Sequence, residues 1–312
     1  MNKIKHTINL KGFNLEKGKI SLSLLEKLSN HLISLAESTM LSFIEGKSYK
    51  KRGKLPDWLS KSLDFQLTGI KEGSTILELE APQLSETLDA IPQLLFEDIQ
   101  PDEITNNSAL GFSMYAYEQV VNEKYDSYLL DKNLLKEMSN FDKFLAGNDS
   151  QIIITNQNNQ KSSIIKREYL EKIKNIEIKT PEPIRTRITG VLDLIKHSNE
   201  QLELLVNNKR IRAYLSDKVS LNDIIKFFGK EISVLGLINY KPSNEAKSIE
   251  IHSFETANDN DTFFKTIPES IKEEIDLKQL ASKQNYIGTE IDSILGKWPG
   301  DESIEELIES VK

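Results

Sequence analysis

The sequence predicts an α+β protein with an N-terminal mixed α/β unit, a small β-barrel and a helical C-terminal tail. Three observations favour this class. Alternating apolar and polar residues recur as paired runs separated by short polar turns, a long amphipathic run follows the first strand-like stretch, and five strand-like runs follow a proline-containing boundary. We therefore divide the chain into four parts: the N-terminal unit 1–178, the barrel 179–257, a polar linker 258–267 and the tail 268–312.

The first hundred residues predict a strand, a helix and a hairpin. Residues 4–13 alternate as a strand does. The next segment, 21–46, has leucines on one stripe, Ser23 and Glu26 at capping-box spacing, and Gly46 as its end. Residues 62–82 form two alternating runs that turn at 71–73. These runs indicate a hairpin that packs beside the helix.

The rest of the N-terminal unit predicts more helix and a second hairpin. Residues 108–123 and 132–147 read as two helical segments, and residues 150–165 read as a hairpin that turns at 156–160. Residues 166–178 fit either a short helix or a strand. We keep these elements in one unit because the hairpins need a shared helical layer to cover one face.

The barrel region follows the boundary KTPEPIRTR. It shows one strand, a strand–turn–strand at Asn207-Asn208, a short helix at 220–230, and another strand–turn–strand around 242–246. Five short strands with a helix between the third and fourth are the element order of an OB-fold. Gly190 and Gly236 fall inside strands, where such barrels bend sharply. We therefore expect an OB-like barrel.

Composition excludes several kinds of chemistry. The chain has 312 residues, a net charge of −8 and no cysteine, so disulfides, thiolate metal sites and cysteine nucleophiles are excluded. The G-x-S-x-G motif of serine hydrolases and the H-E-x-x-H motif of zinc peptidases do not occur. The four histidines, His6, His31, His197 and His252, lack metal-ligand spacing. We expect a protein that is not an enzyme and that uses no cofactor or metal.

Two basic clusters favour a nucleic-acid hypothesis. Gly46-Lys47-Ser48 lacks the earlier glycine of a P-loop and follows a helix instead of a strand. The loop after it therefore reads as a solvated basic loop or as an anion or RNA patch. Its basic side chains, with Tyr49 and Trp58 nearby, are Lys47, Lys50, Lys51, Arg52 and Lys54. The barrel adds a second group with Lys209, Tyr214 and Tyr240, namely Arg185, Arg187, Arg210 and Arg212.

The tail has the most distinctive local pattern. Trp298 precedes a Pro299-Gly300 turn, and the acidic pair Asp301-Glu302 begins a last helix. Four apolar residues follow at i, i+3, i+4 and i+7 spacing: Ile304, Leu307, Ile308 and Val311. A helix of about 11 residues is marginal in water unless it docks on something. The residue pattern leaves open whether it docks on its own chain or on another protein.

The stretch Asp276–Lys312 resembles the C-terminal tails of small bacterial antitoxins encoded beside PIN-domain ribonuclease toxins. The resemblance rests on the order Leu280-Ala281, Gln284-Asn285, Asp292, then Trp298-Pro299 and Asp301-Glu302 ahead of an acidic amphipathic helix. It covers about an eighth of the chain. Residues 1–260 also resemble an uncharacterised bacterial protein family, through LDFQLTGIKEGSTILELEAP and RTRITGVLDLIKHS.

The resemblance implies an antitoxin-like protein that binds and inhibits a PIN-domain toxin through the tail. The residues implied in partner binding are Trp298, Pro299, Asp301, Glu302, Ile304, Leu307 and Ile308. The alternative is a protein that binds single-stranded nucleic acid with the barrel and the basic loop. A homodimer stays open as a further partner. The sequence has no signal peptide pattern and no run of 18 apolar residues, so we expect a cytoplasmic protein without a membrane partner.

Overall fold

The fold is described from a computed structural model of the chain. The structure describes residues 2–16, 18–49, 54–71, 75–88, 104–196 and 201–269. All of these residues belong to one compact unit, Met1–Lys272. Within it the chain forms a helix-covered sheet and a closed barrel, so the protein combines helices and sheets as the sequence predicts.

A five-stranded sheet forms the N-terminal half, in the order β2-β3-β1-β4-β5, and every neighbouring pair in it is antiparallel. The strands are β1 Lys3–Lys11, β2 Gln66–Lys71, β3 Ile76–Pro82, β4 Gln151–Asn156 and β5 Ser162–Lys166. Both predicted hairpins are confirmed as the β2–β3 and β4–β5 pairs. Alternate side chains of β1 are buried from Ile4 to Leu10, so one face of the sheet is covered and the other meets solvent.

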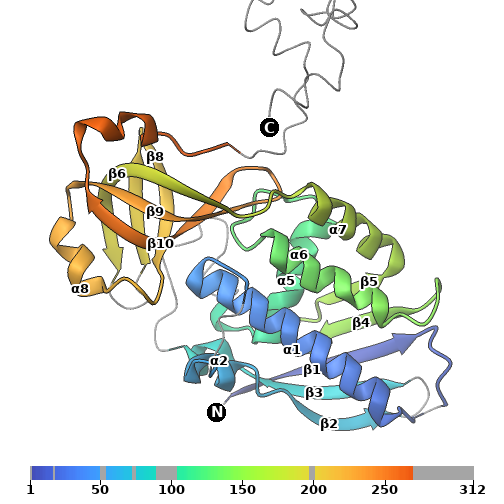
Figure 1. Cartoon of the computed structure of the whole chain (residues 1–312). Helices are drawn as coiled ribbons and strands as arrows, with labels where there is room; N and C mark the ends of the chain where they lie inside the picture. The colour runs from blue at the N-terminus through green and yellow to red at the C-terminus, as the bar shows by residue number, and fades with distance from the viewer. Residues whose placement is uncertain are drawn as a thin grey trace, which may run out of the picture. The chain divides into compact units, whose positions relative to one another are not determined.

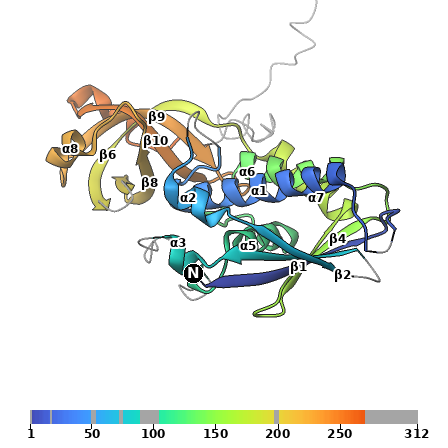
Figure 2. The ribbon, with the colours of Figure 1, turned by 90° about the horizontal axis from the view of Figure 1, so that it is seen from below.

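The helices pack on that covered face (Figure 1 and Figure 2). The α-helices are α1 Leu22–Glu45, α2 Asp57–Ser62, α3 Leu84–Thr87, α5 Ala109–Val121, α6 Lys132–Ser139 and α7 Arg167–Lys179. A 3₁₀ turn, η1 Asn140–Lys143, continues α6. The open choice at 166–178 is thus resolved as a helix. Leu170 and Ile173 of α7 are buried, because helical spacing directs both toward the core.

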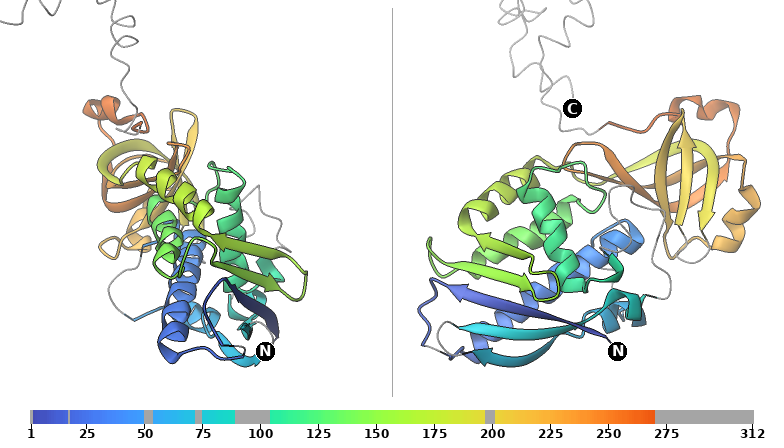
Figure 3. Two further views of the ribbon diagram at one scale, coloured as in Figure 1. Left: turned by 90° about the vertical axis from the view of Figure 1, so that its right-hand side faces the viewer. Right: turned by 180° about the vertical axis from the view of Figure 1, so that it is seen from behind.

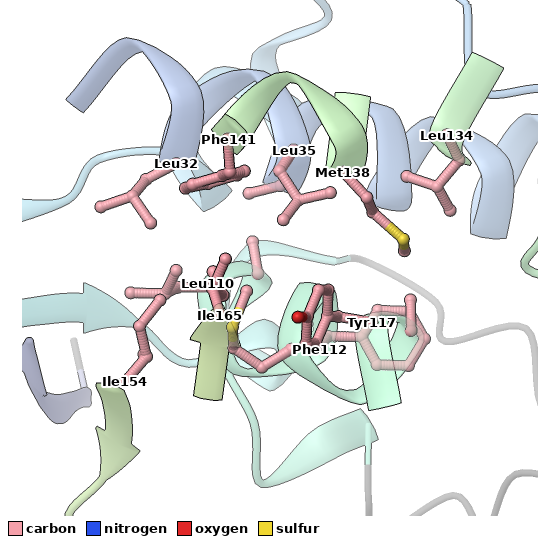
Figure 4. Packing of buried hydrophobic residues seen from close by; sticks show 14 of the residues in the cluster. Leu32, Leu35, Leu110, Phe112, Tyr117, Leu134, Met138, Phe141, Ile154 and Ile165 are labelled. Atoms are coloured by element: carbon pink, nitrogen blue, oxygen red, sulfur yellow. The ribbon is translucent and has the colours of Figure 1, made fainter. Parts of the chain in front are cut away.

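One apolar core lies between the helices and the sheet. Figure 4 shows side chains of α1, α6 and η1 facing side chains of α5, β4 and β5. The upper row contains Leu32, Leu35, Leu134, Met138 and Phe141, and the lower row contains Leu110, Phe112, Tyr117, Ile154 and Ile165. This shared core gives the hairpins the helical cover that the sequence requires.

Helix α1 begins two residues earlier than the capping pattern predicts. Ser21, and not Ser23, is the N-cap, and its hydroxyl accepts a hydrogen bond from the backbone N–H of Leu24. The helix ends at Gly46 as predicted, with a φ of 66° in the left-handed region. Gly46 has a second reason to be glycine. A Cβ atom there would lie 1.9 Å from the ring of Tyr214 in the barrel.

The second half is a closed five-stranded barrel with the circular order β10-β8-β7-β6-β9 (Figure 3, right-hand view). Its strands are β6 Ile184–Lys196, β7 Gln201–Val206, β8 Lys209–Leu215, β9 Glu231–Tyr240 and β10 Ala246–Thr256, with α8 Leu221–Ile224 and η3 Ile225–Phe227 between β8 and β9. Only β8 and β10 pair in parallel among these strands. This closed barrel fits the OB-like expectation.

Local sequence explains how the barrel turns and bends. Asn207 and Asn208 both have positive φ, which is the geometry of a two-residue hairpin turn between β7 and β8. A Cβ atom on Gly190 would lie 2.7 Å from the carbonyl oxygen of Leu205, and one on Gly236 would lie 2.3 Å from that of Glu250. Glycine at these two positions therefore lets neighbouring strands approach closely, as the sequence indicates.

The segment predicted as a polar linker is partly structured. Residues Asp259–Phe264 form a 3₁₀ helix, η4, capped by Asn258 and Asp261 in a reciprocal capping box. Ile267 packs on the barrel core, and the hydroxyl of Tyr240 donates to the carbonyl of Pro268. The linker prediction is wrong here because side-chain caps and one apolar anchor order a polar segment. Among the described residues, no helix has the length and apolarity to cross a membrane.

Candidate functional site

The four barrel arginines lie on two strands that are not neighbours. Arg185 and Arg187 are on β6, and Arg210 and Arg212 are on β8, with β7 between the two strands. Within each pair the residues are two apart and share the outer face of the barrel. The structure therefore brings each pair together but divides the predicted cluster into two groups.

Most of these arginines already have partners on the protein. The guanidinium of Arg187 lies 2.5 Å from a carboxylate oxygen of Glu255 and 3.6 Å from one of Asp261. Arg210 pairs with Asp193 at 3.1 Å. Acidic neighbours thus offset the charge that a phosphate backbone would use.

Arg212 has a different environment. Its guanidinium lies over the ring of Tyr128, 4.1 Å from the centroid, so it contacts the helical half of the chain. The two barrel tyrosines near these arginines are buried. Tyr240 is part of the barrel core, and Tyr214 is 6% exposed. Neither ring offers an open face for a base.

The basic loop is less solvated than the sequence indicates. Lys47 is buried, and its ammonium lies 2.5 Å from a carboxylate oxygen of Glu250 in β10. The hydroxyl of Tyr49 donates to the other oxygen of Glu250. Lys54 is exposed and pairs with Asp57 at 3.5 Å, whereas Trp58 packs on the helical core. The reading of a solvated basic loop is therefore wrong at Lys47. The predicted residues Lys50, Lys51 and Arg52 lie outside the described part of the chain.

A second buried ion pair lies beside the first. Lys247 of β10 is 2% exposed, and its ammonium lies 2.7 Å from a carboxylate oxygen of Asp131. Asp131 also accepts hydrogen bonds from the backbone N–H and the hydroxyl of Ser48, and it caps α6 through the N–H of Leu134. Burial acts to raise the pKa of Asp131, but attraction to Lys247 and these hydrogen bonds outweigh it and lower the pKa. The carboxylate is charged near neutral pH.

The loop between β9 and β10 and the start of β10 add further contacts between the barrel and the helical half of the chain. Lys241 is buried, lies 2.8 Å from Asp126, and has its ammonium 3.7 Å from the ring centroid of Tyr128. The hydroxyl of Ser248 donates to the carbonyl of Gly46. The buried junction, as we call it, comprises Lys47, Asp131, Lys241, Lys247, Ser248 and Glu250.

One residue of the junction, Lys241, lies in a loop that corresponds to a ligand-binding loop of OB-folds. In those folds oligonucleotides bind over the second and third strands and the loops after the first and fourth strands. The counterparts described here are β7, β8 and the β9–β10 loop. Arg212 of β8 and Lys241 of that loop both contact Tyr128. Part of this surface is therefore engaged within the chain.

Exposed aromatic side chains that the sequence analysis missed lie elsewhere on the barrel. Phe263 of η4 is 86% exposed, and Phe228 and Phe264 are also exposed. The guanidinium of Arg187 lies 5.6 Å from the ring centroid of Phe264. The signal in the sequence was two adjacent phenylalanines in an otherwise polar segment. We overlooked it because that segment was read as a linker.

The remaining predicted residues lie outside the described ranges. This holds for all seven tail residues, Trp298, Pro299, Asp301, Glu302, Ile304, Leu307 and Ile308. Within the residues that the structure describes, no three His, Asp or Glu side chains are grouped as metal ligands. Comparison of the chain with protein-family models, with curated proteins and with solved structures gives no match.

Proposed function

We propose that the protein is an antitoxin-like inhibitor that acts without catalysis and binds a PIN-domain ribonuclease through residues 268–312. The observation that carries this proposal is the order of residues in the tail. Trp298-Pro299 precedes Asp301-Glu302, and an acidic helix with a one-sided apolar stripe follows. This order resembles the tails of antitoxins that partner such toxins.

The chemistry of the tail suits the surface of a ribonuclease. An RNA-binding groove needs a basic rim, and an acidic helix can lie across it as a phosphate mimic. A tryptophan and a leucine–isoleucine stripe supply the apolar anchors that dominate binding energy at most interfaces. This is recognition of an amphipathic helix in a groove.

The geometry of the described residues favours a scaffold role for the rest of the chain. Three of the four candidate arginines contact acidic or aromatic groups of the protein itself, and Lys47 is buried. This leaves the tail as the part of the chain with the clearest partner-binding pattern.

Co-purification of the full chain with any PIN-domain protein that a neighbouring reading frame encodes tests the proposal. We expect the full chain to bind that protein and to inhibit its cleavage of RNA, and residues 1–269 to do neither. This truncation keeps Pro268, which accepts a hydrogen bond from Tyr240. Trp298→Ala should weaken binding by about 30-fold, as removal of a hot-spot residue does.

Phe263→Ala is the matched control, because it likewise removes a large aromatic side chain, and Phe263 is exposed near the end of the described chain. It should bind as the full chain does. Equal binding by the full chain and by residues 1–269 would show that the tail is not the binding element.

A second candidate function is binding of single-stranded nucleic acid by the barrel. It is favoured by the closed five-stranded barrel and by Phe263 and Phe264, which lie on the same short helix near Arg187. This aromatic surface is separate from the buried junction. Arg185, exposed on the same strand as Arg187, would add a phosphate contact.

Fluorescence anisotropy with a single-stranded oligonucleotide tests this second function. Binding should fall steeply as salt rises, and Arg185→Glu should weaken it at low salt. Lys5→Glu is the matched control, because Lys5 is an exposed cation on the N-terminal sheet. Absence of binding at low salt, or equal losses in both variants, would reject a role for the barrel.

A further inference from the structure

A cleft of about 830 Å³ opens beside helix α5 and strands β1, β4 and β5. This volume lies in the range of sites that bind small molecules. We propose that the cleft binds an uncharged heterocycle of the nucleobase or nucleoside type, with His6 as the hydrogen-bond donor in its wall. The proposal is independent of the function of the tail.

His6 occupies an unusual position in the cleft wall. It lies on the covered face of β1 and is only 1% exposed. Its Nε2 atom lies 2.8 Å from the hydroxyl oxygen of Ser108, the N-cap of α5. Its other ring nitrogen, Nδ1, is buried and has no hydrogen-bond partner among the described residues. A buried ring nitrogen without a partner is uncommon in a folded protein.

The hydrogen bonds of Ser108 are compatible with both neutral tautomers of His6. The oxygen of Ser108 accepts the backbone N–H of Gly111 at 3.1 Å, and the hydroxyl can either donate to Nε2 of His6 or accept from it. Burial lowers the pKa of His6 to about 4, so the ring is neutral at pH 7. In the proposed site the hydroxyl donates to Nε2, and Nδ1–H is the donor that a ligand acceptor satisfies.

The rest of the lining selects uncharged ligands with donors and acceptors side by side. Carboxamides line the cleft, among them Gln119 in α5, Asn122 just after α5 and Asn156 in β4. Each carboxamide presents one acceptor and two donors, which matches the edge of a nucleobase. Glu118 and Lys161 are the charged lining residues in the described part, and their charges are opposite. The cleft lining therefore has no net charge that would attract a strongly charged ligand.

One aromatic ring at the cleft favours a flat ligand. Tyr115 lines the cleft and is half-buried, and its ring is parallel within 5° to that of the buried Phe112, with centroids 6.0 Å apart. Aromatic side chains of this kind stack on nucleobases in many RNA-binding sites. Carboxamides beside an aromatic ring thus distinguish a planar heterocycle from a purely aliphatic metabolite.

Isothermal titration of the full chain with adenosine, guanosine, cytidine and uridine tests the proposal. At least one nucleoside should bind. His6→Gln keeps an amide near the position of Nε2 but removes Nδ1–H, and it should weaken binding by about tenfold. Asn122→Ala removes an exposed carboxamide at the cleft and should also weaken binding without affecting the fold.

His252→Gln is the matched control, because His252 lies in β10 of the barrel and should leave binding unchanged. Glucose and galactose serve as contrasting uncharged ligands that are rich in hydroxyls. Heat from a sugar alone would overturn the assigned ligand class. Absence of binding by every nucleoside, or equal binding by the wild type, His6→Gln and Asn122→Ala, would overturn the site itself.

Discussion

At the scale of single residues, the pair of Lys247 and Asp131 is the most consequential contact in the described structure. Both side chains are buried, so each needs the other for its charge to be tolerated. Lys247→Met should lower the free energy of unfolding by about 3–5 kcal/mol, because it leaves Asp131 charged and uncompensated. Urea denaturation followed by circular dichroism measures this loss.

Two further variants make this prediction specific. Adding Asp131→Asn to Lys247→Met removes the buried charge but keeps an oxygen for the N–H of Leu134, so part of the stability should return. Lys265→Met breaks a pair with Glu231 at 2.7 Å that is largely exposed, and should cost no more than about 1 kcal/mol. Equal losses in the single and double variants would contradict a role for the charge.

His6 gives the protein a pH dependence of known sign. Its folded-state pKa is lowered from 6.5 to about 4, so between these values the unfolded chain binds a proton that the folded chain does not. The stability from neutral His6 is complete above pH 6.5 and is lost as the pH falls toward 4. Unfolding free energies of the wild type and His6→Gln over this range should converge toward the acidic end. Parallel curves would show that His6 titrates normally in the fold.

At the scale of elements, the end of helix α1 is fixed by the barrel as well as by its own backbone. Gly46→Ala should lower the stability of the fold for two reasons: alanine is strained in the left-handed conformation, and its Cβ atom would clash with Tyr214. Gly229 is the matched control, because it has a φ of 72° with no atom within 4 Å of an added Cβ. Gly229→Ala should cost about 1 kcal/mol, and Gly46→Ala clearly more. Thermal unfolding compares the two, and equal shifts would mean that Tyr214 yields without cost.

The elements that the sequence predicted well are those with local signals. Both hairpins alternate with period two, and α1 carries its leucine stripe and its terminal Gly46, so neighbouring residues alone determine them. The errors lie where distant residues decide. Lys47 is buried because Glu250, far along the chain, lies beside it. No local pattern reveals that partner.

The candidate sites show the same contrast between features that neighbouring residues determine and features that distant residues determine. Arginines two residues apart on one strand share a face because strands alternate, but their acidic partners come from other strands and from η4. The cleft at His6 was missed altogether. Its lining comes from β1, α5, β4 and β5, which only the sheet order β1-β4-β5 brings together. Contacts of this kind depend on the order of the strands in the sheet. No short stretch of the sequence shows that order.

At the scale of the whole molecule, the buried junction should make the helix-covered sheet and the barrel unfold together. Two buried ion pairs, Lys47 with Glu250 and Lys247 with Asp131, cross between the two halves. Separating the halves would expose these charges to water but would also break the hydrogen bonds of Lys247 with Ser42 and of Ser248 with Gly46. We therefore expect a single calorimetric transition, with equal enthalpies from calorimetry and from the van 't Hoff analysis.

Hydrogen exchange can test this coupling strand by strand. In the wild type, the slowest amides of β4 in the sheet and of β9 in the barrel should report the same free energy of opening. The double variant Lys47→Met/Lys247→Met leaves Glu250 and Asp131 buried without their partners, so the two halves should separate before either unfolds. Exchange from β4 and β9 should then differ, and calorimetry should show a broadened or split transition. If both strands still exchange with one free energy in the double variant, the apolar contacts and not the ion pairs hold the halves together.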